Sequence, residues 1–514
     1  MPRLSRLLAV IVFSLVATLT VTTATVRGEA NSNVSFYVST TGNDSNPGTE
    51  EKPFLTLQHA AAQVKPGQIV NVRGGTYCER LAVVSSGNAN GYITFRSQPG
   101  ELAVLDGSCL TPDVGNSAMI LLHNVSYIKI QGFEVRNYKT ADRTRTPAGI
   151  RVWGSGSHIQ ILGNNVHNIE QTYPGRESSG HGANGFGIAV YGTDAKTPIM
   201  DLIVDGNQVH DLQTGSSESL VLNGNVTNFR VTRNRVHNNN NIGIDIIGFE
   251  HTAPDPKVDR ARDGIVSENQ VYDITSKGNP AYGSDVSSDG IYVDGGTRVV
   301  IERNVIHDVD FGIELASEHF VGNTSHITAR NNLIYLCHTA GISIGGYDAK
   351  RGSTEDSVIV NNTLYKNDAW GTKTGEFQMQ YYLRNNIFEN NIVYVGNSGR
   401  ALNSRTGRTE KNTPTVTMDH NVYYFPEGSR AVKWSFDGKD YASFEDYAKA
   451  TGDDPHSVFS DPKFIDPARN NFHLQQNSPA LGNGANLGPS VVGEKDLDGA
   501  ARVKMGKVDI GSYE

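Results

Sequence analysis

One four-residue phrase recurs through most of this chain and limits the folds open to it. The phrase is Asn-x-(Val, Ile or Leu)-(His or Tyr), and successive copies lie 43, 27, 35, 35, 28, 30, 29 and 30 residues apart. A second phrase, Gly-Ile-x-Val or a close variant, precedes most copies. This period predicts a solenoid whose coils each contain two or three short parallel strands. The asparagines are Asn164, Asn207, Asn234, Asn269, Asn304, Asn332, Asn362, Asn391 and Asn421.

Parallel stacking gives the repeated residues a structural explanation. An inward Asn at a turn can hydrogen-bond the backbone and the Asn of the next coil, and so form a ladder. The aromatic residues that follow, such as His167, His210, His237 and His307, occupy one regular position. We therefore interpret both sets as structural, not as ligands or bases.

The stretch from Asn241 to His319 contains three copies of the glycine phrase and the candidate chemistry. The copies are Gly-Ile-Asp-Ile from residue 243, Gly-Ile-Tyr-Val from residue 290 and Gly-Ile-Glu-Leu from residue 312. Strand side chains alternate between faces, so the variable residue of each copy points away from the core. Stacking then predicts an exposed column of Asp245, Tyr292 and Glu314.

Loops of unequal length interrupt the repeat, most of them near this column. In a solenoid, such insertions gather on the functional face. We expect these loops to form the walls of a groove. They cover about residues 168–184, 249–263, 275–289, 318–325 and 346–356.

The two ends read differently from the repeat. Residues 31–110 predict an N-terminal cap and the first coils, with an amphipathic helix from about Leu55 to Val64. Residues 111–430 predict the β-helix with its loops, and 431–514 a C-terminal cap with a helix over 441–451 and short strands and turns after Asp461. We expect this tail to seal the last coils.

The N-terminus predicts export. Arg3 and Arg6 precede an apolar run over residues 7–21, which is the layout of a signal peptide over residues 1–30. No other segment predicts a membrane span, so we expect a secreted or periplasmic monomer. The net charge of −9 argues against nucleic acid as a partner. Cys78 and Cys109 lie about one coil apart and could form a disulfide, whereas Cys337 follows an apolar run and is expected in the core.

The chain resembles the pectate-lyase-like superfamily of right-handed parallel β-helices, and within it the family nine polysaccharide lyases. The likeness rests on the start, FYVSTTGNDSNPGTEEKPFLTLQHAAAQVKPGQIVNVRGGTY, and on QQNSPALGNGA and VDIGSYE near the end. The resemblance implies an all-β right-handed parallel β-helix with a helical N-terminal cap. The family's calcium motif, Asp-Asp-Gly-x-Asp, corresponds to residues 241–245, where only Asp245 is retained. Its lysine base is replaced by Tyr292 or Glu314.

The acidic residues of the column predict glycoside hydrolysis. One carboxyl must protonate the leaving oxygen while another activates water or attacks the sugar. Glu314 is our candidate general acid, with Asp294 or Asp245 as base or nucleophile and Asp289 as a neighbour. Coils lie about 4.8 Å apart, which puts Asp245 and Glu314 roughly 9 to 10 Å apart at the backbone. We expect substrate contacts from Tyr292, Glu250, Glu318, His319, Tyr347, Gln378, Trp153 and Tyr191.

Two other functions remain open on the sequence. The first is a polysaccharide lyase acting on a uronate polymer, for which His319, Tyr292, Arg262 or Lys350 would have to meet in the groove. The second is a non-catalytic glycan-binding protein. No cofactor is expected to be required, although Asp289, Asp294, Asp308 and Asp310 could instead hold Ca²⁺.

Overall fold

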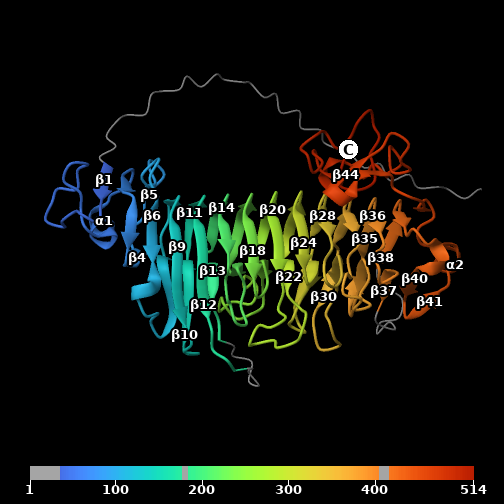
Figure 1. Cartoon of the computed structure of the whole chain (residues 1–514), viewed down its shortest axis with the longest axis horizontal. Coiled ribbons are helices and arrows are strands. Elements are labelled where there is room, and N and C mark those ends of the chain that lie inside the picture. Colours follow the sequence, from blue (N-terminus) through green and yellow to red (C-terminus); the bar gives the residue numbers. More distant parts are fainter. Residues whose placement is uncertain (1–34, 176–182, 405–415) are drawn as a thin grey trace, which may run out of the picture. The chain divides into compact units, whose positions relative to one another are not determined.

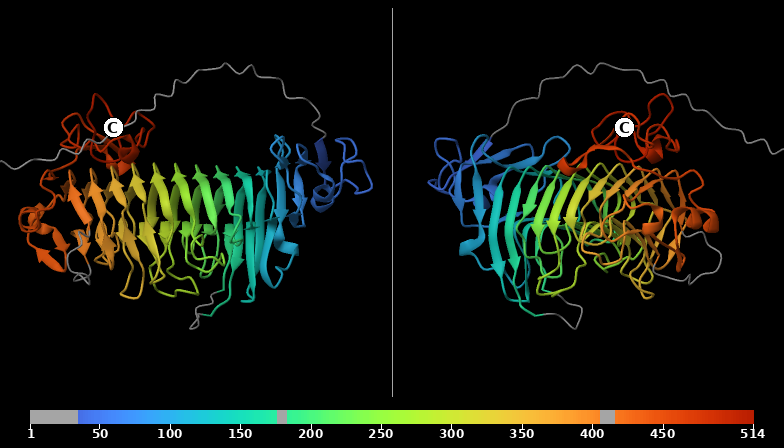
Figure 2. Two further views of the ribbon diagram at one scale, coloured as in Figure 1. Left: turned by 180° about the vertical axis from the view of Figure 1, so that it is seen from behind. Right: turned by 45° about the vertical axis from the view of Figure 1, so that its right-hand side comes forward.

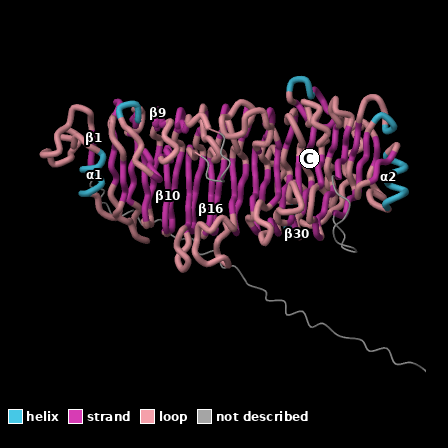
Figure 3. The backbone as a smooth tube through the Cα atoms, turned by 90° about the horizontal axis from the view of Figure 1, so that it is seen from below, coloured by secondary structure: helices cyan, strands magenta, loops and turns pink. Residues whose placement is uncertain are grey.

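The computed structural model describes residues 35–175, 183–404 and 416–514, which form a parallel β-helix (Figure 1). Three parallel sheets run along it, and each coil contributes one strand to each sheet in turn. Strands dominate and the helices are short (Figure 3). The predicted all-β, parallel architecture is confirmed. The predicted signal peptide lies outside the described residues.

The first sheet contains sixteen described strands, three of them on a side branch. They are β1 Ser35–Val38, β2 Ile69–Val72, β5 Ile93–Ser97, β8 Ile128–Gln131, β11 Gly156–Leu162, β14 Ile199–Asp205, β17 Val226–Thr232, β20 Arg262–Ser267, β23 Thr297–Glu302, β27 Thr328–Arg330, β31 Val358–Val360, β35 Asn386–Glu389 and β38 Val416–Asp419, with β26 Asn323–Ser325, β30 Ser353–Glu355 and β34 Leu383–Arg384 on the branch.

The second sheet carries the candidate site and contains thirteen described strands. They are β4 Leu81–Val83, β7 Gly115–His123, β10 Arg145–Gly154, β13 Phe186–Gly192, β16 Leu220–Gly224, β19 Ile244–Ile247, β22 Asp289–Asp294, β25 Phe311–Ala316, β29 Ile342–Ile344, β33 Phe377–Met379, β37 Arg400–Ser404, β40 Lys433–Phe436 and β41 Lys439–Tyr441.

The third sheet also contains thirteen described strands. They are β3 Gly75–Tyr77, β6 Ala103–Asp106, β9 Glu134–Thr140, β12 Asn165–Gln171, β15 Gln208–His210, β18 Arg235–Asn239, β21 Gln270–Ile274, β24 Val305–Val309, β28 Leu333–Tyr335, β32 Thr363–Tyr365, β36 Ile392–Tyr394, β39 Val422–Tyr424 and β42 Val458–Phe459.

The repeated asparagines form the predicted ladder. Each side-chain amide donates to the Oδ1 of the Asn in the next coil, for example Asn269 to Asn304 at 3.0 Å. The same Oδ1 also accepts the backbone N–H of the preceding Asn, so each coil is joined to the next by two hydrogen bonds. At the end of the ladder Asn421 donates to the buried Asp454. This bonding satisfies polar groups that would otherwise be costly to bury.

The His and Tyr residues after the asparagines stack on one another, as the structural interpretation predicted. From His167 to Tyr335, neighbouring rings lie 4.7 to 5.0 Å apart. Aromatic rings at this separation in an offset stack attract each other. Their regular spacing makes the column part of the coil packing.

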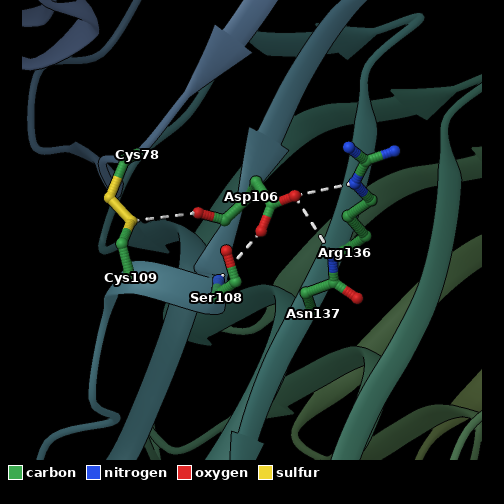
Figure 4. The surroundings of a disulfide bond; sticks show 6 residues. All are labelled: Cys78, Asp106, Ser108, Cys109, Arg136 and Asn137. Atoms are coloured by element: carbon green, nitrogen blue, oxygen red, sulfur yellow. Dashed lines mark hydrogen bonds and ion pairs between the residues drawn. A yellow bond between two sulfur atoms is a disulfide. The ribbon is translucent and has the colours of Figure 1, made fainter.

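The N-terminal segment contains helix α1, Leu57–Gln63, close to its predicted range. Thr56 caps it by accepting the N–H of His59, and the helix packs against β1 and β4. Its role as a cap stays a prediction. The predicted disulfide joins Cys78 to Cys109, whose Cα atoms lie 6.2 Å apart (Figure 4). Cys337 is buried in the core, also as predicted.

The C-terminal residues do not all close the end of the solenoid as expected. The antiparallel strands β40 and β41 and helix α2, Phe444–Thr451, pack at the last coils. The tail after Asp461 instead folds back along the solenoid, where Phe464, Phe472 and Ile510 pack on the third sheet. Hydrogen bonds from Arg330 to Ser490 O and from Asn361 to Asp509 O hold it at the adjacent edge of the first sheet. Figure 1 shows this tail beside β28 and β36. It contains β43 Phe464–Asp466, β44 Asn471–Leu474 and α3 Pro489–Val492, and 3₁₀ turns occur at Gly107–Cys109, Ser429–Ala431 and Pro467–Arg469.

Among the described residues, no helix is both long enough and apolar enough to cross a membrane.

Candidate active site

The three predicted column residues lie in register on the second sheet. Asp245 in β19 pairs with Tyr292 in β22, and Tyr292 pairs with Glu314 in β25. Their strand neighbours, such as Ile244 and Val293, point into the core, so the alternation of the sequence places the three side chains on the outer face. The neighbouring positions in this column are Val221 before Asp245 and Ser343 after Glu314.

The sequence predicts an exposed column, but in the structure other segments cover it. Asp245 and Tyr292 are only 2% and 5% exposed, and Glu314 is partly buried. Two of the predicted loops reach this region, because Tyr282 contacts Asn241 and the Glu318 N–H donates to Asp294. In Figure 2 the loops of the green to yellow part of the chain project from one edge of the solenoid. These covering segments remove the carboxyl groups from water.

Asp289 and Glu314 form a carboxyl pair at the corner where β22 begins. The two side chains lie close enough for the charge of Glu314 to act on Asp289, so they do not ionise independently. Burial raises the pKa of Glu314 to about 7, and hydrogen bonds from Ser343 and Asp289 offset part of that rise. Burial, and then the charges of Glu314 and Asp245, raise the pKa of Asp289 well above its usual range. The pair can therefore supply a proton near neutral pH.

Gln380, which the sequence did not single out, also holds Glu314. Its amide donates to Glu314 Oε1 at 3.0 Å, beside the Ser343 hydroxyl at 3.1 Å. Two donors on one oxygen fix the orientation of the carboxyl group. The predicted contact Gln378 is buried next to Ser343, while Tyr347 is 43% exposed and lies beneath the Arg351 guanidinium at 4.3 Å.

Asp245 is the first residue of the column, and no described residue donates a hydrogen bond to its Oδ1 atom. Burial, and then the charges of Glu218 and Asp294, raise its pKa well above the usual range. Burial also raises the pKa of the adjacent Tyr292 hydroxyl, followed by the charge of Asp294. None of Asp245, Asp289, Asp294 and Glu314 forms an ion pair with Lys or Arg among the residues that the structure describes.

Asp294, Glu250, Glu318 and His319 gather at the other end of β22. The His319 ring bonds Glu250 at 3.0 Å, and this bond raises the pKa of His319. Burial and the charge of Glu318 raise the pKa of Asp294, although the Glu318 N–H donates to Asp294 Oδ1 at 2.7 Å. This backbone donor opposes part of the rise at Asp294.

Glu218 joins this cluster and was missed in the sequence. It is buried just before β16, and burial followed by the charge of Glu250 raises its pKa to about 8. The glycine phrase is absent there, since residues 217–222 read SESLVL. A buried-strand signal directly after Glu218 was the only indication in the sequence.

The four proposed calcium ligands are separated. Asp308 bonds the ring of His307 on the third sheet, whereas Asp310 accepts from Ser276, Ser288 and His338. Possible ligand atoms of Glu250, Asp294 and His319 do lie within 4.8 Å of one another. Two carboxylates and an imidazole suit a hard or borderline divalent ion better than a soft one.

The lyase residues do not all converge on the site. Tyr292 and His319 belong to it, but Arg262 lies in the first sheet and donates to backbone oxygens and Asn225. Lys350 is exposed in its loop. The structure thus places no arginine or lysine of that predicted set against the carboxyl pair.

The aromatic candidates Trp153 and Tyr191 lie three and two coils before Asp245, respectively, on the same face. They pair in register across β10 and β13, and their rings stack at 5.4 Å. Arg151 points to the same face, in the column that leads to Asp245 through Ala189 and Val221.

Two sequence-family models match this chain. Residues 36–186 match the family described as "Pel9A-like, right handed beta helix region". Residues 175–369 match the family described as "Periplasmic copper-binding protein (NosD)".

Three proteins illustrate what the whole chain is similar to. It is 40% identical over 456 residues to the uncharacterized protein YwoF of Bacillus subtilis strain 168, an alignment that covers 89% of this chain and 94% of YwoF. The solved GH136 lacto-N-biosidase from Eubacterium ramulus is 15% identical with a TM-score of 0.48, over 76% of this chain and 63% of that one. The solved pectate lyase Pel9A is 15% identical with a TM-score of 0.45, over 93% and 96% of the two chains.

Proposed function

This chain belongs to the family of Bacillus subtilis YwoF and has the pectate-lyase-like parallel β-helix fold, and from that premise we propose that it is a secreted enzyme that hydrolyses glycosidic bonds. The observation that carries the proposal is the neighbouring pair of Asp289, which is buried, and Glu314, which Ser343 and Gln380 orient, without an arginine or lysine ion pair among the described residues. Such a pair can protonate the glycosidic oxygen, which must receive a proton in order to leave.

Glu314 is the general acid in this proposal. It is less buried than Asp289, and Ser343 and Gln380 orient its carboxyl group. Its pKa of about 7 keeps a useful fraction protonated at neutral pH. Asp289 passes its proton to Glu314 when Glu314 has protonated the leaving oxygen. The proton that the base takes from water is released to solvent, and Asp289 takes up a new proton from solvent before the next turnover.

Asp294 is the preferred base, with Asp245 as the alternative. Asp294 lies two residues beyond Tyr292 in β22, and Tyr292 is the coil neighbour of Glu314. A strand rise of about 3.3 Å per residue and a coil spacing of about 4.8 Å put Asp294 and Glu314 roughly 8 Å apart at the backbone. That separation leaves room for a water between the carboxyl groups and favours inversion at the anomeric carbon.

A polysaccharide lyase is the second candidate, favoured by the presence of Tyr292 and His319 in the site. A lyase must neutralise a uronate and remove the C5 proton with a base. His319 is paired with Glu250 and is therefore not free to neutralise a uronate. Burial, and then the carboxyl groups around Tyr292, raise the pKa of its hydroxyl and so make it a poor base for the C5 proton. We therefore rank hydrolysis first.

The test replaces Glu314 by Gln and measures reducing ends released from a polysaccharide panel. We expect Glu314→Gln to lose about 10²-fold or more of the wild-type rate, because an amide cannot donate the catalytic proton. Glu389→Gln, a partly buried carboxyl in β35 of the first sheet, serves as the matched control and should retain activity.

The product and two further variants decide between the functions. An unsaturated, ultraviolet-absorbing uronate product would establish the lyase. Glycan retention without product release, or full activity in both Glu314→Gln and Asp294→Asn, would refute hydrolysis at this site and leave a binding protein or another site.

A further inference from the structure

Arg151 is a buried arginine, 2% exposed. Within the described part of the chain, its Nε and Nη2 atoms have no hydrogen-bonding partner. No carboxylate of the described residues pairs with it. Burial lowers the pKa of Arg151 to about 10, so the side chain keeps its charge at neutral pH. A buried charge of this kind is unfavourable unless something binds it.

Aromatic rings surround this cation but leave its donors unsatisfied. The guanidinium carbon lies 5.7 Å from the Trp153 ring centre, 5.2 Å from Phe186 and 5.9 Å from Tyr191. Ring faces attract a cation, but they do not replace hydrogen bonds in the plane of the guanidinium fork. Trp153 and Tyr191 are only partly buried, so this small aromatic site borders solvent.

The same sheet face connects Arg151 to the carboxyl cluster. Arg151 pairs with Ala189, Ala189 with Val221 and Val221 with Asp245. Three coil steps of about 4.8 Å correspond to roughly 14 Å. An oligosaccharide, but not a single sugar, can span that distance. Tyr191 experiences the charges of both Arg151 and Glu218, so it lies between the two sites.

We propose that Arg151, Trp153 and Tyr191 form a subsite for the carboxylate of an acidic sugar residue that lies several sugars from the cleaved bond. The guanidinium fork matches a carboxylate with two parallel N–H···O bonds. The flat rings of Trp153 and Tyr191 can pack against the apolar face of a sugar.

This proposal rests on the proposed function and narrows its substrate. The carboxyl cluster from Glu218 to Glu314 repels anions, so the residue cleaved there carries no acid group. The substrate is therefore a heteroglycan with neutral and acidic residues rather than a continuous polyuronate.

The experiment compares glucuronic acid heteroglycans before and after chemical reduction of their carboxyl groups. The probes are hyaluronan, glucuronoxylan and xanthan, and retention of the full-length protein in affinity gels gives the dissociation constants. We expect the wild type to bind at least one native glycan tenfold or more tightly than its reduced form. Arg151→Gln should remove that difference and leave binding of the reduced form unchanged, while Arg151→Lys should restore part of it.

Arg235→Gln is the matched control, because Arg235 also lies over a ring, that of Tyr272, but on the exposed third sheet. Melting temperatures in sodium glucuronate and in glucose at equal ionic strength show that each variant is folded. They should rise with glucuronate for the wild type and the control, and not for Arg151→Gln.

Three results would overturn the subsite. In the first, Arg151→Gln weakens binding of the native and the reduced glycans equally. In the second, it weakens neither. In the third, the wild type retains no probe in a way that depends on its carboxyl groups. Carboxyl-dependent retention without cleavage would refute the enzyme but support the subsite. Cleavage that changes neither when the carboxyl groups of the glycan are reduced nor in Arg151→Gln would support the enzyme but refute the subsite.

Discussion

At the residue scale, the carboxyl cluster of the second sheet cannot ionise completely. Asp245 and Asp289 each have a buried oxygen without a donor, and Glu218 and Glu314 have raised pKa values. Like charges this close hold protons between them, and the cluster titrates as a unit. Asp294 receives the backbone N–H of Glu318, which opposes part of the rise in its pKa. In the proposed hydrolysis, protonated members of this cluster would serve as the acid and an ionised member as the base.

The raised pKa values predict that stability falls as the pH rises above about 5. A carboxyl whose pKa in the folded protein exceeds its unfolded value near 4.5 stabilises the fold fully at pH values below the unfolded pKa. This contribution is lost as the pH rises through the pKa of the folded state. The folded values are about 7 for Glu314 and about 8 for Glu218. The free energy of unfolding of the wild type, measured in urea, should fall between about pH 5 and pH 8. In Glu218→Gln or Glu314→Gln this fall should be smaller than in the wild type by on the order of 1 to 3 kcal/mol.

Glu101→Gln provides the control for that pH dependence. The Gly74 N–H and Arg73 lower the pKa of Glu101, so its titration lies below this pH range. Its slope from pH 5 to pH 8 should match the wild type. An unchanged slope in both cluster variants would mean that these acids are ionised in the folded protein.

At the element scale, the period of the repeat was enough to predict the coils, the Asn ladder and the register of Asp245, Tyr292 and Glu314. Each coil repeats the same local bonding, so equal spacing in sequence becomes vertical stacking in space. The burial of the column was not predictable from the sequence. It depends on how the loops that contain Tyr282 and Glu318 fold over the sheet, and these loops do not follow the repeat. Glu218 was missed because β16 lacks the glycine phrase. That no described residue pairs with Arg151 follows from three-dimensional packing alone.

The ladder predicts a large cost for removing one of its internal members. Asn269 donates to Asn304 Oδ1 and Val231 O, and accepts from the side chain and the N–H of Asn234. Asn269→Ala leaves several buried groups without partners, at about 1 to 3 kcal/mol each. Chemical denaturation should show a loss of roughly 3 kcal/mol or more, against little change for the exposed Asn116→Ala. Equal stability of the two variants would show that the ladder adds nothing beyond coil packing.

At the scale of the whole molecule, the described chain combines two kinds of packing. The coils share one continuous apolar core from Val38 to Tyr447. The tail belongs to a second cluster, in which Phe464, Phe472 and Ile510 pack on the outer face of the third sheet. The carboxyl cluster lies on the second sheet, so the tail and the candidate active site occupy different faces of the solenoid. Stability of the tail and activity should therefore be separable.

Phe472 is the residue through which that separation can be tested. It is buried against Tyr335 and Tyr365, with ring centres 5.3 and 4.9 Å away. Phe472→Ala should cost about 3 to 5 kcal/mol of local packing, enough to release the tail without opening the coils. Hydrogen exchange should rise over residues 461–514 but not along the Asn ladder, and glycan cleavage should persist. Ile465→Ala, half-exposed in the same tail, should change neither. Cooperative unfolding of tail and ladder in Phe472→Ala would instead make the tail an obligatory part of the solenoid, because its packing would then support every coil.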